Sequence, residues 1–116
     1  KRNRMANTFK SVTSGSIGTG LTDVYTCPGS TTTIVLGASM SNTTTNPIGG
    51  SIKLAKNGTS AGQDDVFVVK NAPVPAGSSI EVMAGNKVVM QASDKLQFQS
   101  DTADSLDSIV SILEIT

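Results

Sequence analysis

Residues 72–115 have the sequence APVPAGSSIEVMAGNKVVMQASDKLQFQSDTADSLDSIVSILEI. Three short apolar segments, Ser79–Met83, Lys87–Gln91 and Lys95–Gln99, are separated by turn-forming residues, and the stretch ends in the alternating run Ser108–Ile115. Short segments of this kind, bounded by Gly, Pro, Asn, Asp and Ser, are typical of β-strands. We therefore expect an antiparallel meander over residues 72–115, with turns too short to hold a catalytic insertion.

The rest of the chain shows the same two-residue periodicity. Further strands are expected at residues 9–14, 21–27, 32–40, 51–56 and 66–69, the first of them ending at a Ser14-Gly15-Ser16 turn. Gly37 indicates a bulge or a close approach of another backbone, and Asn57-Gly58 predicts a tight hairpin turn. No stretch of about 11 residues keeps a helical stripe. The sequence predicts an all-β fold: a single-domain antiparallel β-sandwich, jelly-roll or immunoglobulin-like, with eight to nine strands and little or no helix.

Length and composition limit the class of protein. The 116 residues fit one domain. Ser and Thr make up about a quarter of the chain, charged residues 16% and aromatic residues 3%, a composition that favours strands and turns over a charge-rich disordered chain. No apolar run approaches the roughly 18 residues of a membrane-spanning helix, so no membrane partner is expected. The aromatic residues Phe9, Tyr25, Phe67 and Phe98 are spread singly over the expected strands, where we expect them to fill the core.

The reactive side chains are few. The chain has no histidine, and Cys27 is its only cysteine, so the commonest general base is absent and neither an intrachain disulfide nor a structural zinc site can form. We expect Cys27 to be a semi-buried structural thiol. Asp101, Asp104 and Asp107 are ligands of the type that calcium prefers, but their spacing is not that of a helix–loop–helix calcium site, and a solvated turn is favoured. No enzyme activity, metal or cofactor is expected.

The basic residues are unevenly placed. Lys1, Arg2 and Arg4 precede Met5, which resembles an ordinary translation start. Residues 1–7 are therefore expected to be a basic extension or arm, and residues 8–116 the β-sandwich domain. The first four residues are either an upstream or processing remnant or a genuine arm that contacts a neighbouring subunit. The remaining six basic residues stand against nine acidic ones, so no basic face for nucleic acid is expected.

A polar loop at residues 41–47, with the sequence SNTTTNP, is the best candidate for an exposed contact segment. Asn46 precedes Pro47 and is thereby kept out of helical geometry. The candidate subunit-contact or partner-contact residues are Lys1, Arg2, Arg4, Asn42, Thr43, Thr44, Thr45 and Asn46.

In the order and spacing of several segments, the chain resembles small virion structural proteins of tailed bacteriophages, particularly cyanophage-like viruses. The segments are DVYTCPG at 23–29, TIVLG at 33–37, APVPAGSSIEV at 72–82, NKVVMQASD at 86–94 and SILEI at 111–115. The resemblance spans nearly the whole chain, from about Thr8 to the C-terminus. The resemblance implies a non-enzymatic β-sandwich that is present in many copies on a particle, with no catalytic residues to transfer.

The function implied by this resemblance is a capsid decoration or cement protein on the particle exterior, which forms a homo-oligomer and contacts the major capsid protein. A tail, neck or fibre-attachment component in contact with tail proteins is the alternative. A host-surface carbohydrate-binding module that uses the loop at 41–47 is a third hypothesis, although the chain has no Trp and one Tyr for stacking on a sugar. The expected location is the virion, assembled in the host cytoplasm.

Overall fold

The computed structural model describes residues 7–56, 63–82 and 87–116, which form nine strands and no helix. The strands are β1 (Asn7–Ile17), β2 (Thr22–Thr26), β3 (Thr32–Asn42), β4 (Ile48–Ala55), β5 (Val66–Val74), β6 (Ser79–Val82), β7 (Val88–Met90), β8 (Lys95–Ser100) and β9 (Leu106–Ile115). The expected all-β class is confirmed. The described residues contain no helix long and apolar enough to cross a membrane.

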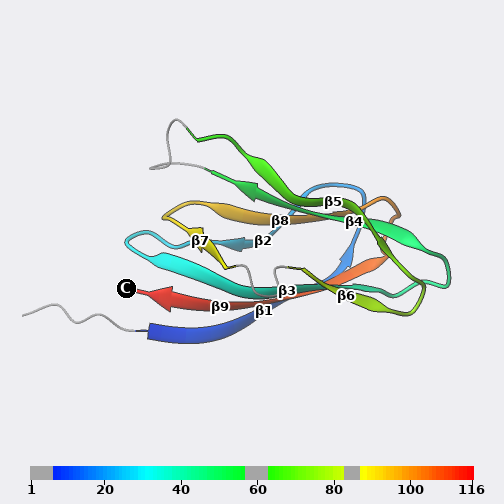
Figure 1. Cartoon of the computed structure of the whole chain (residues 1–116), viewed down its shortest axis with the longest axis horizontal. Helices are drawn as coiled ribbons and strands as arrows, with labels where there is room; N and C mark the ends of the chain where they lie inside the picture. Colours follow the sequence, from blue (N-terminus) through cyan, green and yellow to red (C-terminus); the bar gives the residue numbers. More distant parts are fainter. Residues whose placement is uncertain (1–6, 57–62, 83–86) are drawn as a thin grey trace, which may run out of the picture.

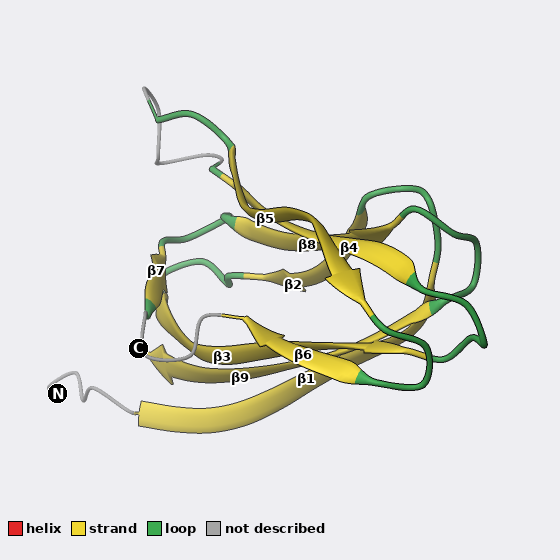
Figure 2. Ribbon diagram, turned by 45° about the vertical axis from the view of Figure 1, so that its right-hand side comes forward, coloured by secondary structure: helices red, strands yellow, loops and turns green. Residues whose placement is uncertain are grey.

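Two antiparallel sheets pack face to face (Figures 1 and 2). Sheet A has the order β1-β9-β3-β6, with β7 also paired to β3, and sheet B has the order β2-β8-β4-β5. The first four strands pair with the later ones in reverse order: β4 with β5, β3 with β6 and β7, β2 with β8, and β1 with β9. A chain doubled back on itself and wrapped into two sheets in this way is a jelly roll. The structure thus decides between the two kinds of sandwich that the sequence left open.

The expected meander over residues 72–115 is wrong in its pairing. Its segments are strands, but within the described residues β6, β7, β8 and β9 do not pair with one another. The chain passes into sheet B for β8 and returns to sheet A for β9, which pairs with β1 and β3. Alternation in a sequence shows which face of each strand is buried, and it does not show which strand lies beside it.

Strand β1 continues through the residues at which a turn was expected. Its pairing with β9 shifts between Ser14 and Ile17, and Ser16 has a φ of 54°. The Ser16 N–H donates a hydrogen bond of 3.1 Å to the Asp107 carboxylate on β9. Because a partner strand supplies this acceptor, the Ser-Gly-Ser sequence forms a β-bulge instead of ending the strand.

The bulge expected at Gly37 is confirmed by the pairing of β3 with β9, which shifts between Val35 and Gly37. The hairpin turn expected at Asn57-Gly58 lies outside the described residues.

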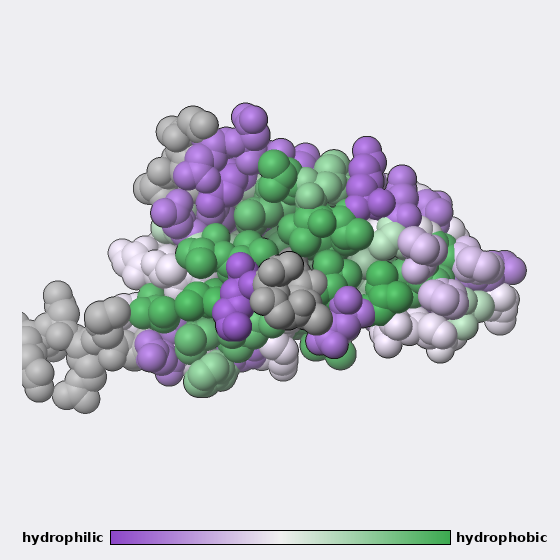
Figure 3. Space-filling view, viewed as in Figure 1, coloured by the Kyte–Doolittle hydropathy of each residue, from purple (hydrophilic) through white to green (hydrophobic). Residues whose placement is uncertain are grey.

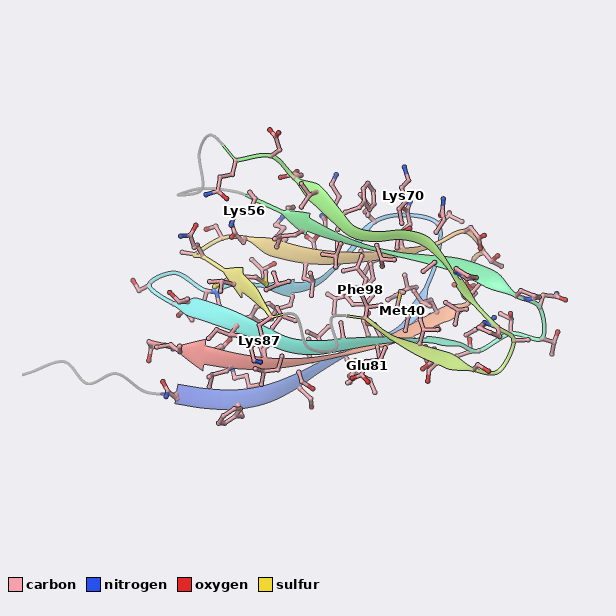
Figure 4. The ribbon with its side chains drawn as sticks, in the orientation of Figure 1. Met40, Lys56, Lys70, Glu81, Lys87 and Phe98 are labelled. Atoms are coloured by element: carbon pink, nitrogen blue, oxygen red, sulfur yellow. The ribbon has the colours of Figure 1, made fainter. Side chains whose placement is uncertain are left out.

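The core lies between the two sheets, where Met40 of β3 and Phe98 of β8 are both fully buried (Figure 4). Tyr25 is also buried, as expected, but Phe9 is 72% and Phe67 38% exposed. The prediction that all aromatic residues fill the core is therefore wrong for these two. Both alternate onto outer faces: Phe9 onto that of sheet A and Phe67 onto that of sheet B.

Candidate interaction surface

A row of apolar side chains crosses the outer face of sheet A. The register places Phe9 opposite Leu113, Leu113 opposite Ile34, and Ile34 opposite Val89. Directly opposite residues of neighbouring strands share one face of a sheet. These four residues, called here the apolar row, therefore form a continuous line over β1, β9, β3 and β7.

Both ends of the apolar row are exposed to solvent. Phe9 is 72% and Val89 54% exposed, while Leu113 and Ile34 between them are partly buried. Ile109 lies on the same face of β9 and is 50% exposed. Contiguous exposed apolar groups on a soluble protein mark sites of contact with another macromolecule. The outer face of sheet A is the first such candidate in this structure.

Apolar surface also continues along one side of the sandwich. Figure 3 shows it between β5 and the strands β6 and β7. Partly buried residues of these strands that pack against the core are Val68, Val69, Ala72, Ile80, Val82 and Val88. This side leaves the edges of both sheets without a paired strand among the described residues, as is common at protein contacts.

The alternation of these strands was visible in the sequence, but the exposed face of sheet A was not. In β9 the set Ile109, Ser111 and Leu113 alternates with Ser108, Val110 and Ile112, and both sets contain large apolar residues. Only the packing shows that the second set is buried and the first faces outward.

Close to Ile109, the outer face of sheet A becomes acidic. Glu81 of β6 lies opposite Ser39, which lies opposite Ile109. Asp107 of β9 lies opposite Ser41 on the same face. A hollow of about 390 Å³ opens here, lined mostly by small side chains; its residues are Thr13, Ser14, Gly15, Ser41, Asp107, Ser108 and Ile109.

The outer face of sheet B carries the opposite charge. The Lys70 ammonium lies 4.9 Å and the Lys53 ammonium 5.6 Å from the centre of the Phe67 ring, within the range of cation–π attraction. These three residues are called here the basic cluster. Neither of its lysines forms an ion pair with a described residue, whereas Lys95 on the same sheet is paired with Asp23 at 3.3 Å.

A buried polar network joins the two sheets. The Tyr25 hydroxyl donates a hydrogen bond of 2.6 Å to Glu114 and lies 2.7 Å from the Thr33 hydroxyl, and Lys10 lies 2.9 Å from the other oxygen of Glu114. Burial, and next the bond to Glu114, raise the pKa of Tyr25. The hydrogen bonds from Tyr25 and then Lys10 hold the pKa of Glu114 below its usual range. Each of these groups has a hydrogen-bond or ion-pair partner within the network, which indicates a structural role. The network of Tyr25, Thr33, Glu114 and Lys10 is called here the clamp.

Cys27 is more deeply buried than expected, with 1% of its surface exposed. Its Sγ lies 3.2 Å from the Thr31 carbonyl oxygen and 3.3 Å from the Thr33 hydroxyl. A reactive cysteine needs both access and a group that stabilises its thiolate. The position of Cys27 fits a packed structural thiol.

The loop at 41–47 is organised around Asn42, which is only 3% exposed. The Asn42 amide donates to the carbonyl oxygens of Asn46 at 2.7 Å and Val74 at 3.0 Å, and it accepts from the Thr44 N–H at 2.8 Å. The expectation of an exposed loop therefore fails for Asn42, whose side chain replaces backbone hydrogen bonds that a loop lacks.

Of the other candidate contact residues, Thr43, Thr45 and Asn46 are exposed and Thr44 is partly buried. Lys1, Arg2 and Arg4 lie outside the described residues. The structure does not bring this loop onto the apolar row, and a contact role for these residues stays a prediction.

The three aspartates considered as calcium ligands do not form a site. Asp101 and Asp104 are exposed in the loop that follows β8, and Asp107 belongs to β9, where it binds the Ser16 N–H. In the described part of the chain no group of three or more His, Cys, Asp or Glu side chains is placed to hold a metal ion.

No protein-family model and no curated protein matches this chain. Among solved structures, a chain of the Bacillus endospore appendages, a family of disulfide-linked pili, superposes with a TM-score of 0.54 at 13% identity over 99% of this chain and 89% of that one. A chain of infectious bursal disease virus, Gt strain, gives a TM-score of 0.49 at 11% identity over 97% of this chain and 32% of that one. The likeness to the appendage chain is one of fold.

Proposed function

We propose that this chain is a non-enzymatic virion structural protein of a tailed bacteriophage, and that it decorates the outside of the capsid in many copies. The observation that carries the proposal is the apolar row, with Phe9 and Val89 exposed at its ends. Such a row on the face of a rigid sheet fits a flat protein surface better than a small molecule, which binds in a concave pocket.

The chemistry of the described residues supports a structural role. The most buried ionisable groups, such as Tyr25 with Glu114 and Lys56 with Asp94, are held by hydrogen bonds or ion pairs inside the fold. The hollow beside Ile109 is lined mainly by Ser, Thr and Gly residues with one carboxylate. General acid–base catalysis needs a titratable pair open to a substrate, and these groups face one another instead.

A tail or fibre-attachment component is the second candidate. The fold likeness to a chain of the Bacillus endospore appendages favours it, because a pilus repeats one subunit along a filament. This jelly roll is then a building block that repeats along a tail or fibre instead of over a capsid lattice.

Copy number separates the two candidates. Isotope-dilution mass spectrometry of purified particles is expected to find the chain in a simple ratio to the major capsid protein. A copy number that is a multiple of three or six, and is not in simple ratio to the major capsid protein, would favour the second candidate. Absence from purified particles would overturn both.

The apolar row is tested by its incorporation into particles. Phe9→Asp places a charge in the row and is expected to abolish incorporation. Leu21→Asp is the matched control, because Leu21 is 40% exposed and lies between β1 and β2, outside the row and outside both sheets. Equal incorporation of the two variants would show that the row is not the contact surface.

A further inference from the structure

Both outer faces of the sandwich combine exposed apolar groups with charges of one predominant sign. Figure 4 shows Lys70 pointing away from the sandwich beyond sheet B, and Glu81 pointing away from it beyond sheet A. On sheet B two lysine ammonium groups lie within 5.6 Å of the centre of the exposed Phe67 ring. On sheet A Asp107 lines the hollow beside the exposed Ile109, and Glu81 lies two strands away on the same face. The two faces are therefore complementary to each other.

We propose that the outer face of sheet B of one copy docks on the outer face of sheet A of a second copy, with the basic cluster seated at the hollow beside Ile109. This inference rests on the proposed function, because a chain that acts in many copies on a particle needs a contact between copies. The occupant of the hollow beside Ile109 is then another copy of this chain, and the apolar row is left for contact with the particle.

The hollow has the size and lining that the basic cluster needs. Its volume is about 390 Å³, and a cavity of about 150 Å³ already holds a benzene ring. The remaining space receives the methylene stems of Lys53 and Lys70. Ile109 supplies an apolar wall for the Phe67 ring, and the Ser and Gly residues of the floor leave room for it.

The charges favour this arrangement over a symmetric one. Packing sheet A on sheet A brings Glu81 and Asp107 toward the same carboxylates of the partner, with Lys87 before β7 as the cation at that edge. Packing sheet B on sheet B brings Lys53 and Lys70 toward their own copies. Like charges across an interface are costly, and opposite charges set the partner and the register. The pairing of sheet B with sheet A places the two lysines of the basic cluster, which have no ion-pair partner among the described residues, against the carboxylates of Glu81 and Asp107.

A contact between two different faces is heterologous, so it repeats in one direction. It produces a closed ring if the rotation between copies closes, and an open row if it does not. In an open row, the last copy always presents an unoccupied face to which another copy binds. One short chain can extend along a tail or over a lattice in this way.

Charge exchange tests the contact. Sedimentation velocity of the full chain at low ionic strength, at concentrations up to about 1 mM, measures association. Lys53→Glu/Lys70→Glu and Glu81→Lys are each expected to weaken association by about tenfold or more. A mixture of the two variants is expected to restore it, because each variant then offers the other a face of opposite charge.

Asp64→Lys is the matched control for Glu81→Lys. It changes the net charge by the same amount, but Asp64 is exposed and precedes β5, outside both sheets. Circular dichroism of each variant confirms that it is folded. Unchanged association of Asp64→Lys with weakened association of Glu81→Lys supports the contact.

Three results would overturn the inference. The wild-type chain could stay monomeric at every concentration tested. The folded Lys53→Glu/Lys70→Glu variant could associate as strongly as the wild type, or the mixture of variants could fail to restore association. These outcomes are separable from the proposed function. A monomer in solution that is nevertheless abundant in particles overturns only this contact. Association as described, by a chain absent from particles, overturns only the proposed function.

Discussion

The Tyr25 hydroxyl on β2 donates a hydrogen bond of 2.6 Å to the Glu114 carboxylate on β9, and this bond joins sheet B to sheet A. Lys10 on the edge strand β1 lies 2.9 Å from the second carboxylate oxygen. One carboxylate of β9 thus ties this strand to β1 and β2, which are far from it in the sequence. The clamp holds β1 in place, and β1 presents Phe9 at the end of the apolar row.

Removal of the tyrosine hydroxyl tests the clamp. Tyr25→Phe is expected to lower the free energy of unfolding by about 1–3 kcal/mol, because the buried carboxylate loses a donor that water cannot fully replace. Urea denaturation measures the change, and a double-mutant cycle with Glu114→Gln isolates the coupling. Additive effects of the two substitutions would show that the bond contributes nothing of its own.

The same carboxylate predicts sensitivity to acid. The hydrogen bonds from Tyr25 and Lys10 lower the pKa of Glu114 in the folded protein, so its contribution to stability is present above the ordinary value of 4.5 and is lost as the pH falls through the lower folded value. Stability measured from neutral pH downward is therefore expected to fall less steeply in Glu114→Gln. Glu81→Gln is the control, since Glu81 is exposed; an equal change in both variants would contradict the assignment.

The strands were predictable because each carries its own alternation, but their neighbours were not. The pairing of β1 with β9 places Phe9 opposite Leu113. A local sequence pattern does not show a pairing between residues so far apart in the chain. The bulge at Gly37 was visible because a single glycine inside a strand pattern commonly marks a bulge or a close approach of another backbone. The bulge at Ser16 was not, because Ser-Gly-Ser suits a turn equally well until the distant Asp107 supplies its acceptor.

The exposure of residues in the candidate site could not be predicted from local sequence either. Phe9 and Phe67 were expected in the core, since a large aromatic residue in a strand usually is buried. Their exposure depends on which face of each strand meets the other sheet. Asn42 was expected to be exposed, because a polar residue in a polar loop is usually solvated. In the structure its side chain is buried instead, and its amide donates hydrogen bonds to backbone carbonyl oxygens.

Gly50 on β4 packs closely against the end of the Met40 side chain. A Cβ at Gly50 would lie 2.7 Å from the Met40 sulfur and 3.1 Å from its methyl carbon, and Met40 is fully buried. Gly50→Ala is therefore expected to cost about 1–3 kcal/mol of stability by overpacking, and Met40→Ala about 2–5 kcal/mol by leaving a cavity. The double variant is expected to lose less than the sum, because the added methyl group occupies part of that cavity. Chemical denaturation of all three variants measures this, and strict additivity would contradict it.

Lys56 and Asp94 form an ion pair of 2.7 Å whose side chains are only 9% and 0% exposed. Asp94→Asn is expected to cost about 3–5 kcal/mol, because it leaves a buried ammonium without its counter-charge. Asp23→Asn is the matched control: its pair with Lys95 is 34–45% exposed, and such pairs contribute about 0–1 kcal/mol. Similar losses in the two variants would show that burial does not govern the strength of these pairs.

Cys27 is the only cysteine of the chain. Its side chain is 1% exposed and is packed against the Thr31 carbonyl oxygen, so the native protein is expected to resist a thiol reagent, and the denatured protein to react with one equivalent per chain. Assemblies of the chain are accordingly expected to keep their size in a reducing agent, which light scattering measures. Dispersal on reduction would show that Cys27 leaves its buried position to link subunits, and it would place the contact between copies at the Cys27 end of β2 instead of on the outer faces of the two sheets.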